Sequence, residues 1–248
     1  MIPQVKFQIS RIDETLDVIM HFLNSNEGSH NQDQIFEKYP LLEEKLRGVE
    51  EDKKREIVKN FFNKFETKNK KIFELILNEF QKEWDKINNG IMKALEEVNE
   101  IKWNEKYDTF IVRITSNPIC PRYLDKNTFD IYFGVHNDLM IKISLHEISH
   151  FIFFEKWKEI FPDYKEEEFE FPHLIWKLSE IVPYIILSDK KIQDIYLHEP
   201  VVYDAFHKVE VDGKPLLNLL KEIYSNKKDF EDFVKKSWVL IQENKDKL

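Results

Sequence analysis

The chain has 248 residues, a formal net charge of −9, 33% charged residues and 42% hydrophobic residues. This length allows one large domain, or a smaller domain with a helical extension, and the apolar content is enough for a sizeable core. Acidic and basic residues are mixed along the chain, which argues against a general surface for nucleic acid or anionic membrane.

Cysteine and glycine usage narrows the class of protein further. A single cysteine, Cys120, excludes an intrachain disulfide. The first residues lack a basic start followed by an apolar run, so we expect no signal peptide. The longest apolar run, 181–187, is too short to span a bilayer. We therefore expect a cytoplasmic protein without a membrane partner. Neither of the glycine-rich phosphate-binding patterns, G-x-G-x-x-G and G-x-x-x-x-G-K-[ST], occurs in the chain.

The N-terminal part of the chain has mostly helical periodicity. A short apolar alternation at 5–9 precedes a helical pattern at 12–23, and the polar stretch 24–30 predicts a turn. From residue 31 to 104 the pattern is almost wholly helical. Residues 66–71 either divide two helices or lie on the exposed side of one long helix, and 88–90 predicts a helix stop.

The pattern changes near residue 107. Residues 109–114 and 128–133 are rich in strand-forming types, and the second stretch ends at Gly134. We expect these strands to form a small antiparallel sheet followed by a buried helix. The chain is therefore predicted to be an α+β protein, mostly helical, with a helical N-terminal region at 1–105 and a second domain at 106–248.

The predicted helix at 139–157 carries the pattern His-Glu-x-x-His. His146 and His150 lie four residues apart, so both imidazoles can reach one metal ion from the same face. Glu147 is rotated by about 60° from His150 and points toward the same side. The rest of this helix is apolar all round, and buried ionisable groups cost free energy unless they are paired or bind a metal. The sequence therefore predicts a zinc site here.

The motif and its strand-strand-helix setting resemble the zincin metallopeptidases. The resemblance covers the five-residue motif and its setting, and it implies that His146 and His150 bind Zn²⁺ while Glu147 is the general base. The bonding chemistry agrees independently, because neutral imidazole suits zinc and a nearby carboxylate can take a proton from water. The implied fold is a zincin-like domain.

Several residues compete for the place of third metal ligand. A metzincin-like histidine would lie six residues beyond His150, where the chain has Lys156, so that arrangement is excluded. A deformylase-like cysteine would have to be Cys120, but the motifs of that family are absent. Glu180 lies in a nearly all-apolar predicted helix at 171–187, where a lone carboxylate needs a partner. This resembles the gluzincin arrangement, with His173 as the alternative ligand.

A donor to the developing oxyanion is expected after the third ligand. Tyr203 and His207 lie four residues apart and would share a face if 200–208 is helical, while Tyr196 and His198 are alternatives. Beyond a turn at 212–213, two amphipathic helices are expected to close the chain.

The expected function is that of a zinc-dependent metallopeptidase acting on a peptide or protein substrate. The alternatives are a catalytically silent zinc-binding interaction protein and a zinc hydrolase of a non-peptide amide. An intact Glu147 argues against the silent protein, because a structural zinc site needs no base and usually closes with four protein ligands. The sequence does not select a substrate or an oligomeric state.

Overall fold

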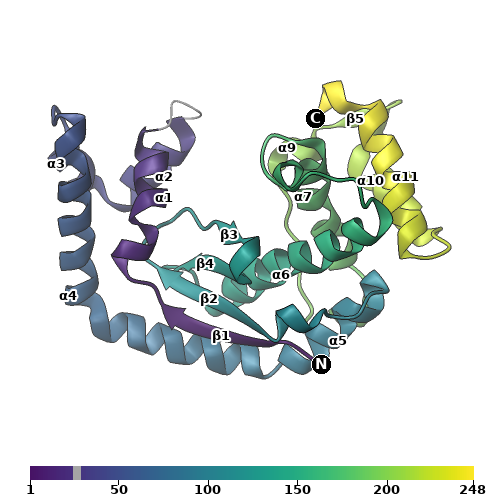
Figure 1. Cartoon of the computed structure of the whole chain (residues 1–248), viewed down its shortest axis with the longest axis horizontal. Helices are drawn as coiled ribbons and strands as arrows, with labels where there is room; N and C mark the ends of the chain where they lie inside the picture. The colour runs from purple at the N-terminus through teal and green to yellow at the C-terminus, as the bar shows by residue number, and fades with distance from the viewer. Residues whose placement is uncertain (25–28) are drawn as a thin grey trace. The chain divides into compact units, whose positions relative to one another are not determined.

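The structure is a computed structural model of the chain, described for residues 1–24 and 29–248 (Figure 1). It is mostly helical with a small mixed sheet, in agreement with the predicted α+β, mostly helical class. The chain divides into two compact units. We call Val5–Lys86 with Thr109–Met140 the sheet unit, and Met1–Gln4 with Ile87–Asp108 and Ile141–Leu248 the motif unit. The strands predicted at 109–114 and 128–133 therefore belong to the same unit as the N-terminal helices.

The sheet has the strand order β1-β2-β4-β3. Its strands are β1 (Gln4–Ile9), β2 (Thr109–Thr115), β3 (Arg122–Tyr123) and β4 (Thr128–Tyr132). Strand β2 runs parallel to β4, with Ile111 opposite Thr128, whereas β3 is antiparallel to β4. The predicted antiparallel sheet is therefore wrong. Residues 116–127 form a crossover long enough to return the chain to the start of β2, which a parallel pair requires.

Four helices complete the sheet unit: α1 (Ile12–Asn24), α2 (Ser29–Lys38), α3 (Pro40–Leu46) and α4 (Glu51–Asp85). Their inward faces form one apolar core that includes Leu16, Ile35, Leu42, Val58 and Phe62. Helix α4 runs without interruption through 66–71, which confirms the alternative of one long helix. Residues 25–28 of the predicted turn lie outside the described residues, and α2 already begins at Ser29.

The motif unit is built from longer helices joined by short elements. These are α5 (Asn88–Asn99), α6 (Asn137–Ile160, of which the part from Ile141 belongs to this unit), α7 (Leu174–Ile186), α8 (Lys190–Gln193), α9 (Asp204–His207), α10 (Leu216–Ser225) and α11 (Phe230–Glu243). The helix stop predicted at 88–90 lies a few residues late, because α4 already ends at Asp85 and Asn88 begins α5. The side-chain amide of Asn88 donates to the carbonyl of Pro3 at 3.0 Å. The two expected C-terminal helices are confirmed as α10 and α11, and both pack against α7.

A hairpin of β5 (Glu210–Val211) and β6 (Lys214–Pro215) precedes α10. Asp212 and Gly213 between its strands both have positive φ, of 50° and 76°. Two-residue hairpin loops favour this left-handed backbone, and Asp-Gly adopts it readily. The turn predicted at 212–213 is thereby confirmed. Among the described residues, none of the helices combines the length and apolar composition needed to cross a membrane.

The second half of α6 is fastened to the segment that precedes β2. Glu155 on α6 accepts hydrogen bonds from Lys106 Nζ at 2.8 Å and from the Tyr107 hydroxyl at 3.0 Å. Burial opposes ionisation of Glu155, but the hydrogen bond and charge of Lys106 outweigh it, so the pKa of the carboxyl is lowered. A carboxyl with a lowered pKa stabilises the folded state above its unfolded pKa, and this contribution is lost as the pH falls through the folded value.

Glu155→Gln is expected to reduce thermal stability at neutral pH, because the amide keeps the acceptor for Tyr107 but removes the negative charge facing Lys106. We expect the unfolding midpoint to fall by about 2 °C at pH 7, and by less at about pH 3.5, which lies below the unfolded-state pKa of a glutamate, where the contribution of the charge declines. Calorimetry of both proteins at the two pH values measures this. An equal deficit at both values would contradict a role for the charge.

Candidate metal centre

The histidine-bearing helix α6 is buried on nearly all sides, which explains the absence of an amphipathic pattern in its sequence. Leu145, Ile148, Phe153 and Phe154 are each at most 2% exposed, although they point in different directions around the helix axis. His150 is fully buried, and the side chain of His146 is 15% exposed. The two imidazoles therefore occupy the interior of the motif unit, where each polar atom needs a partner.

Helix α7 brings a carboxylate to the same place. The side chain of Glu180 is 3% exposed, and its helical neighbours Ser179, Ile181 and Val182 are buried as well. The helix continues through Pro183, which has no N–H to donate to the carbonyl of Ser179. An apolar helix with one inward carboxylate is stable only if that carboxylate meets a polar or charged group.

The two histidines supply those groups. Nε2 of His146 lies 3.2 Å from Oε2 of Glu180, and Nε2 of His150 lies 3.6 Å from Oε1 of the same carboxylate. The two imidazole rings are 4.7 Å apart between centroids and nearly perpendicular, at 80°. Each oxygen of Glu180 thus faces a different histidine.

Glu147 lies at the edge of this cluster. His146, Glu147 and His150 can each offer a donor atom, and these atoms all lie within 4.8 Å of one another. The group could hold a metal ion. Glu147 also lines a pocket, so one of its faces is open to a small molecule while the deeper Glu180 is enclosed.

That pocket has a volume of ≈ 270 Å³ and is lined by Ile143, His146, Glu147, Val201, Val202 and Tyr203. Its polar groups come from α6 and from Tyr203, and its remaining wall is aliphatic. An apolar pocket with a few converging polar groups is the usual form of a small-molecule or substrate site. Tyr203 is 57% exposed and lies across the pocket from the histidine helix.

The structure separates Tyr203 from His207. Tyr203 precedes α9, which begins only at Asp204, so the condition that 200–208 is helical is not met. The backbone of Tyr203 is extended, and the two side chains do not share a helical face. His207 is exposed and its ring contacts Tyr184 edge-on at 5.8 Å between centroids, away from the residues that line the pocket.

The other candidates occupy separate positions. His173 is the exposed residue before α7, on extended backbone. His198 is buried, and its Nδ1 lies 2.8 Å from the carbonyl oxygen of Tyr196, so these two alternatives contact each other. Cys120 belongs to the sheet unit, where its thiol lies 3.7 Å from the carbonyl oxygen of Asn117.

Three aliphatic lining residues were not anticipated from the sequence. Ile143 lies three residues before His146 and therefore on the same helical face, a signal that was available. Val201 and Val202 lie in a segment without periodicity, and only their adjacency to Tyr203 hinted at a role.

Comparison of the chain with protein-family models, with curated proteins and with solved structures finds no match in any of the three. The resemblance to zincins therefore depends on residues 146–150 and their local setting.

Proposed function

We propose that the chain is a zinc-dependent peptidase whose metal is held by His146, His150 and Glu180, with Glu147 as general base. The observation that carries the proposal is the convergence of both histidine Nε2 atoms on the two oxygens of one buried carboxylate, at 3.2 and 3.6 Å. Burial of three such groups is costly unless something satisfies them together, and a divalent cation does so.

The spacing of the donor atoms supports zinc in particular. Ligands at about 2.0–2.1 Å from a tetrahedral Zn²⁺ lie about 3.3–3.4 Å from one another, close to both distances observed here. Two imidazoles with one carboxylate form a mixed nitrogen and oxygen set, which suits zinc better than the all-oxygen preference of magnesium or calcium. Three protein ligands also leave one position for water, as catalytic zinc sites do.

The chemistry that follows is hydrolysis of an amide. Bound zinc supplies a Lewis acid that polarises water and the substrate carbonyl. As the oxygen of the attacking water bonds to the carbonyl carbon, Glu147 takes a proton from that water. Protonated Glu147 then gives this proton to the amine nitrogen as the C–N bond breaks. The products are a carboxylate and an amine, and Glu147 returns to its ionised form.

Tyr203 is the proposed donor to the developing oxyanion. It lines the same pocket as His146 and Glu147, and its exposed position lets the hydroxyl meet a substrate. His207, the other candidate, contacts Tyr184 and does not line that pocket. Ile143, Val201 and Val202 form an apolar wall suited to an aliphatic substrate side chain.

Glu147→Gln tests the reaction, because the amide cannot accept the proton of water although it has nearly the same shape. We expect loss of peptide cleavage by at least about 100-fold with zinc retained, measured by mass spectrometry of a peptide-library digest. Glu159→Gln, on the same helix but exposed, is the matched control and should cleave normally. A wild-type chain that retains zinc and cleaves no peptide would exclude the peptidase function.

Zinc content distinguishes the two candidate third ligands. Glu180→Ala should weaken zinc binding by at least about 100-fold, because two histidines remain, whereas His173→Ala should keep about one zinc per chain. Elemental analysis after dialysis against a weak chelator measures both, and circular dichroism checks that each variant is folded. The reverse order of loss would assign the ligand to His173.

Tyr203→Phe separates the two candidate oxyanion donors. Removal of one such donor is expected to lower kcat by about 100-fold while KM and zinc content change little. His207→Ala is the comparison and should leave kcat within about twofold of wild type, since its ring contacts Tyr184 away from the pocket. A large loss in His207→Ala with none in Tyr203→Phe would refute the assignment.

A further inference from the structure

Helix α4 of the sheet unit carries an uncovered apolar stripe. Ile57, Phe61, Phe65, Ile72 and Leu75 recur at spacings that keep them on one face of the helix. Ile72 is 48% exposed and Leu75 is 65% exposed. The first three pack against the apolar core from one side and are only partly buried. About 27 Å of this helix therefore presents apolar side chains outward.

Next to this stripe, α3 and α4 enclose a groove of ≈ 390 Å³. Its apolar lining comes from Ile57, Phe61 and Phe65 of α4 and from Leu41 of α3, which is 62% exposed. The remaining lining residues are Asn60 and three lysines, Lys45, Lys64 and Lys68. None of the lining residues is acidic. The groove combines apolar walls with positive charge along its length.

Among the described residues, the three groove lysines have no ion pair, unlike several other lysines of α4. Along α4, Lys53, Lys54, Lys59 and Lys70 each lie within ion-pair distance of a carboxylate. No ion pair joins Lys45, Lys64 or Lys68 to any carboxylate in residues 1–24 or 29–248. In a chain of net charge −9, unpaired cations gathered around one apolar groove indicate a partner that brings the acidic groups.

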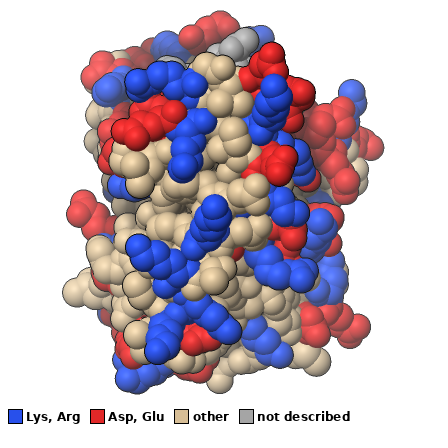
Figure 2. Space-filling view, turned by 90° about the vertical axis from the view of Figure 1, so that its left-hand side faces the viewer, with Lys and Arg blue, Asp and Glu red and all other residues tan. Residues whose placement is uncertain are grey.

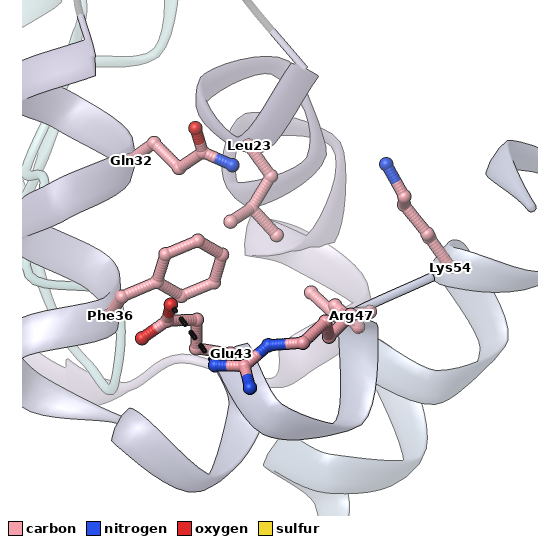
Figure 3. A pocket seen from close by; sticks show the side chains of 7 residues that line it. Leu23, Gln32, Phe36, Glu43, Arg47 and Lys54 are labelled. Carbon is pink, nitrogen blue, oxygen red and sulfur yellow. Dashed lines mark ion pairs between the residues drawn. The ribbon is translucent and has the colours of Figure 1, made fainter. Parts of the chain in front are cut away.

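Figure 2 shows the side of the molecule that lies at the left in Figure 1, where Lys and Arg side chains surround exposed atoms of other residue types. A second pocket of the sheet unit, lined by residues of α1 to α4, shows the contrast (Figure 3). There Arg47 pairs with Glu43 at 3.9 Å, and Lys54 pairs with Glu51 at 2.6 Å. Both cationic residues of that pocket are in ion pairs, whereas the three lysines of the α3–α4 groove are not, within the part of the chain that the structure describes.

We propose that the α3–α4 groove and the adjoining stripe bind an acidic amphipathic helix of a partner protein. The apolar face of such a helix would cover Leu41, Phe61 and Phe65 and continue over Ile72 and Leu75. Its Asp and Glu residues would face Lys45, Lys64 and Lys68. Helix-in-groove recognition uses this combination of apolar anchors and flanking charges. The groove has walls from two helices, α3 and α4, which fits a third helix better than the broad surface of a membrane, and the inference is independent of the zinc site.

The test is fluorescence anisotropy with a labelled synthetic peptide of about five helical turns, with leucines on one face and glutamates along both edges. The full chain should bind it saturably, with a dissociation constant below about 100 μM that weakens as salt is raised. Lys64→Glu/Lys68→Glu should weaken binding by about tenfold or more. Mass spectrometry afterwards checks that the peptide is intact.

Two matched controls make the outcome specific. Lys70→Glu/Lys82→Glu applies the same charge change to exposed residues of α4, one on the opposite side and one beyond the stripe, and should bind within about twofold of wild type. Leu41→Ser should weaken binding several-fold. Val239→Ser, which changes a residue of α11 that is 51% exposed, should leave binding unchanged. Absence of saturable binding, equal losses in both lysine pairs, or binding to anionic phosphatidylserine vesicles but not to the peptide would overturn the proposal.

Discussion

The burial of Glu180 between His146 and His150 is the interaction on which the motif unit depends. A carboxylate that is 3% exposed, on an otherwise apolar helix, is tolerable only because two imidazoles meet its oxygens. The same constraint holds α6 against α7, since neither helix can shift without leaving a buried polar atom unpaired. Ile143 on α6 and the Val201–Tyr203 segment then form the outer wall of a pocket beside the cluster. The packing of the motif unit and the proposed chemistry thus involve the same three side chains.

Much of this centre could be predicted from the sequence, because helical geometry places residues four apart on one face. His146 and His150 needed no tertiary information, and Glu180 was identified by the absence of any other polar partner in its helix. The pairing of Tyr203 with His207 could not be predicted in the same way. It assumed a helix that begins only at Asp204, and short helices have weak sequence signals. Val201 and Val202 line the pocket from an irregular segment, where no periodicity marks a functional side chain.

The fold shows the same division between local and long-range information. The strands β2 and β4 were predicted within a residue or two, and the helical character of the segment that forms α4 was predicted without its bounds, since both follow from local periodicity. The direction in which β2 pairs with β4 depends on the course of residues 116–127, and composition says little about that. In the sheet unit, the groove lysines are notable because, among the described residues, no carboxylate lines the apolar groove that they surround. Charge that a chain leaves uncompensated around an apolar surface is the kind of feature that a partner can use.

Anomalous diffraction at the zinc edge, from crystals grown with stoichiometric zinc, would locate the metal. We expect one strong peak within about 2.0–2.2 Å of Nε2 of His146, Nε2 of His150 and a carboxylate oxygen of Glu180, with Glu147 nearby but outside bonding distance. A peak that lies elsewhere in the chain, or well-ordered density with His146 bonded directly to Glu180 and no anomalous signal, would contradict the proposed zinc site.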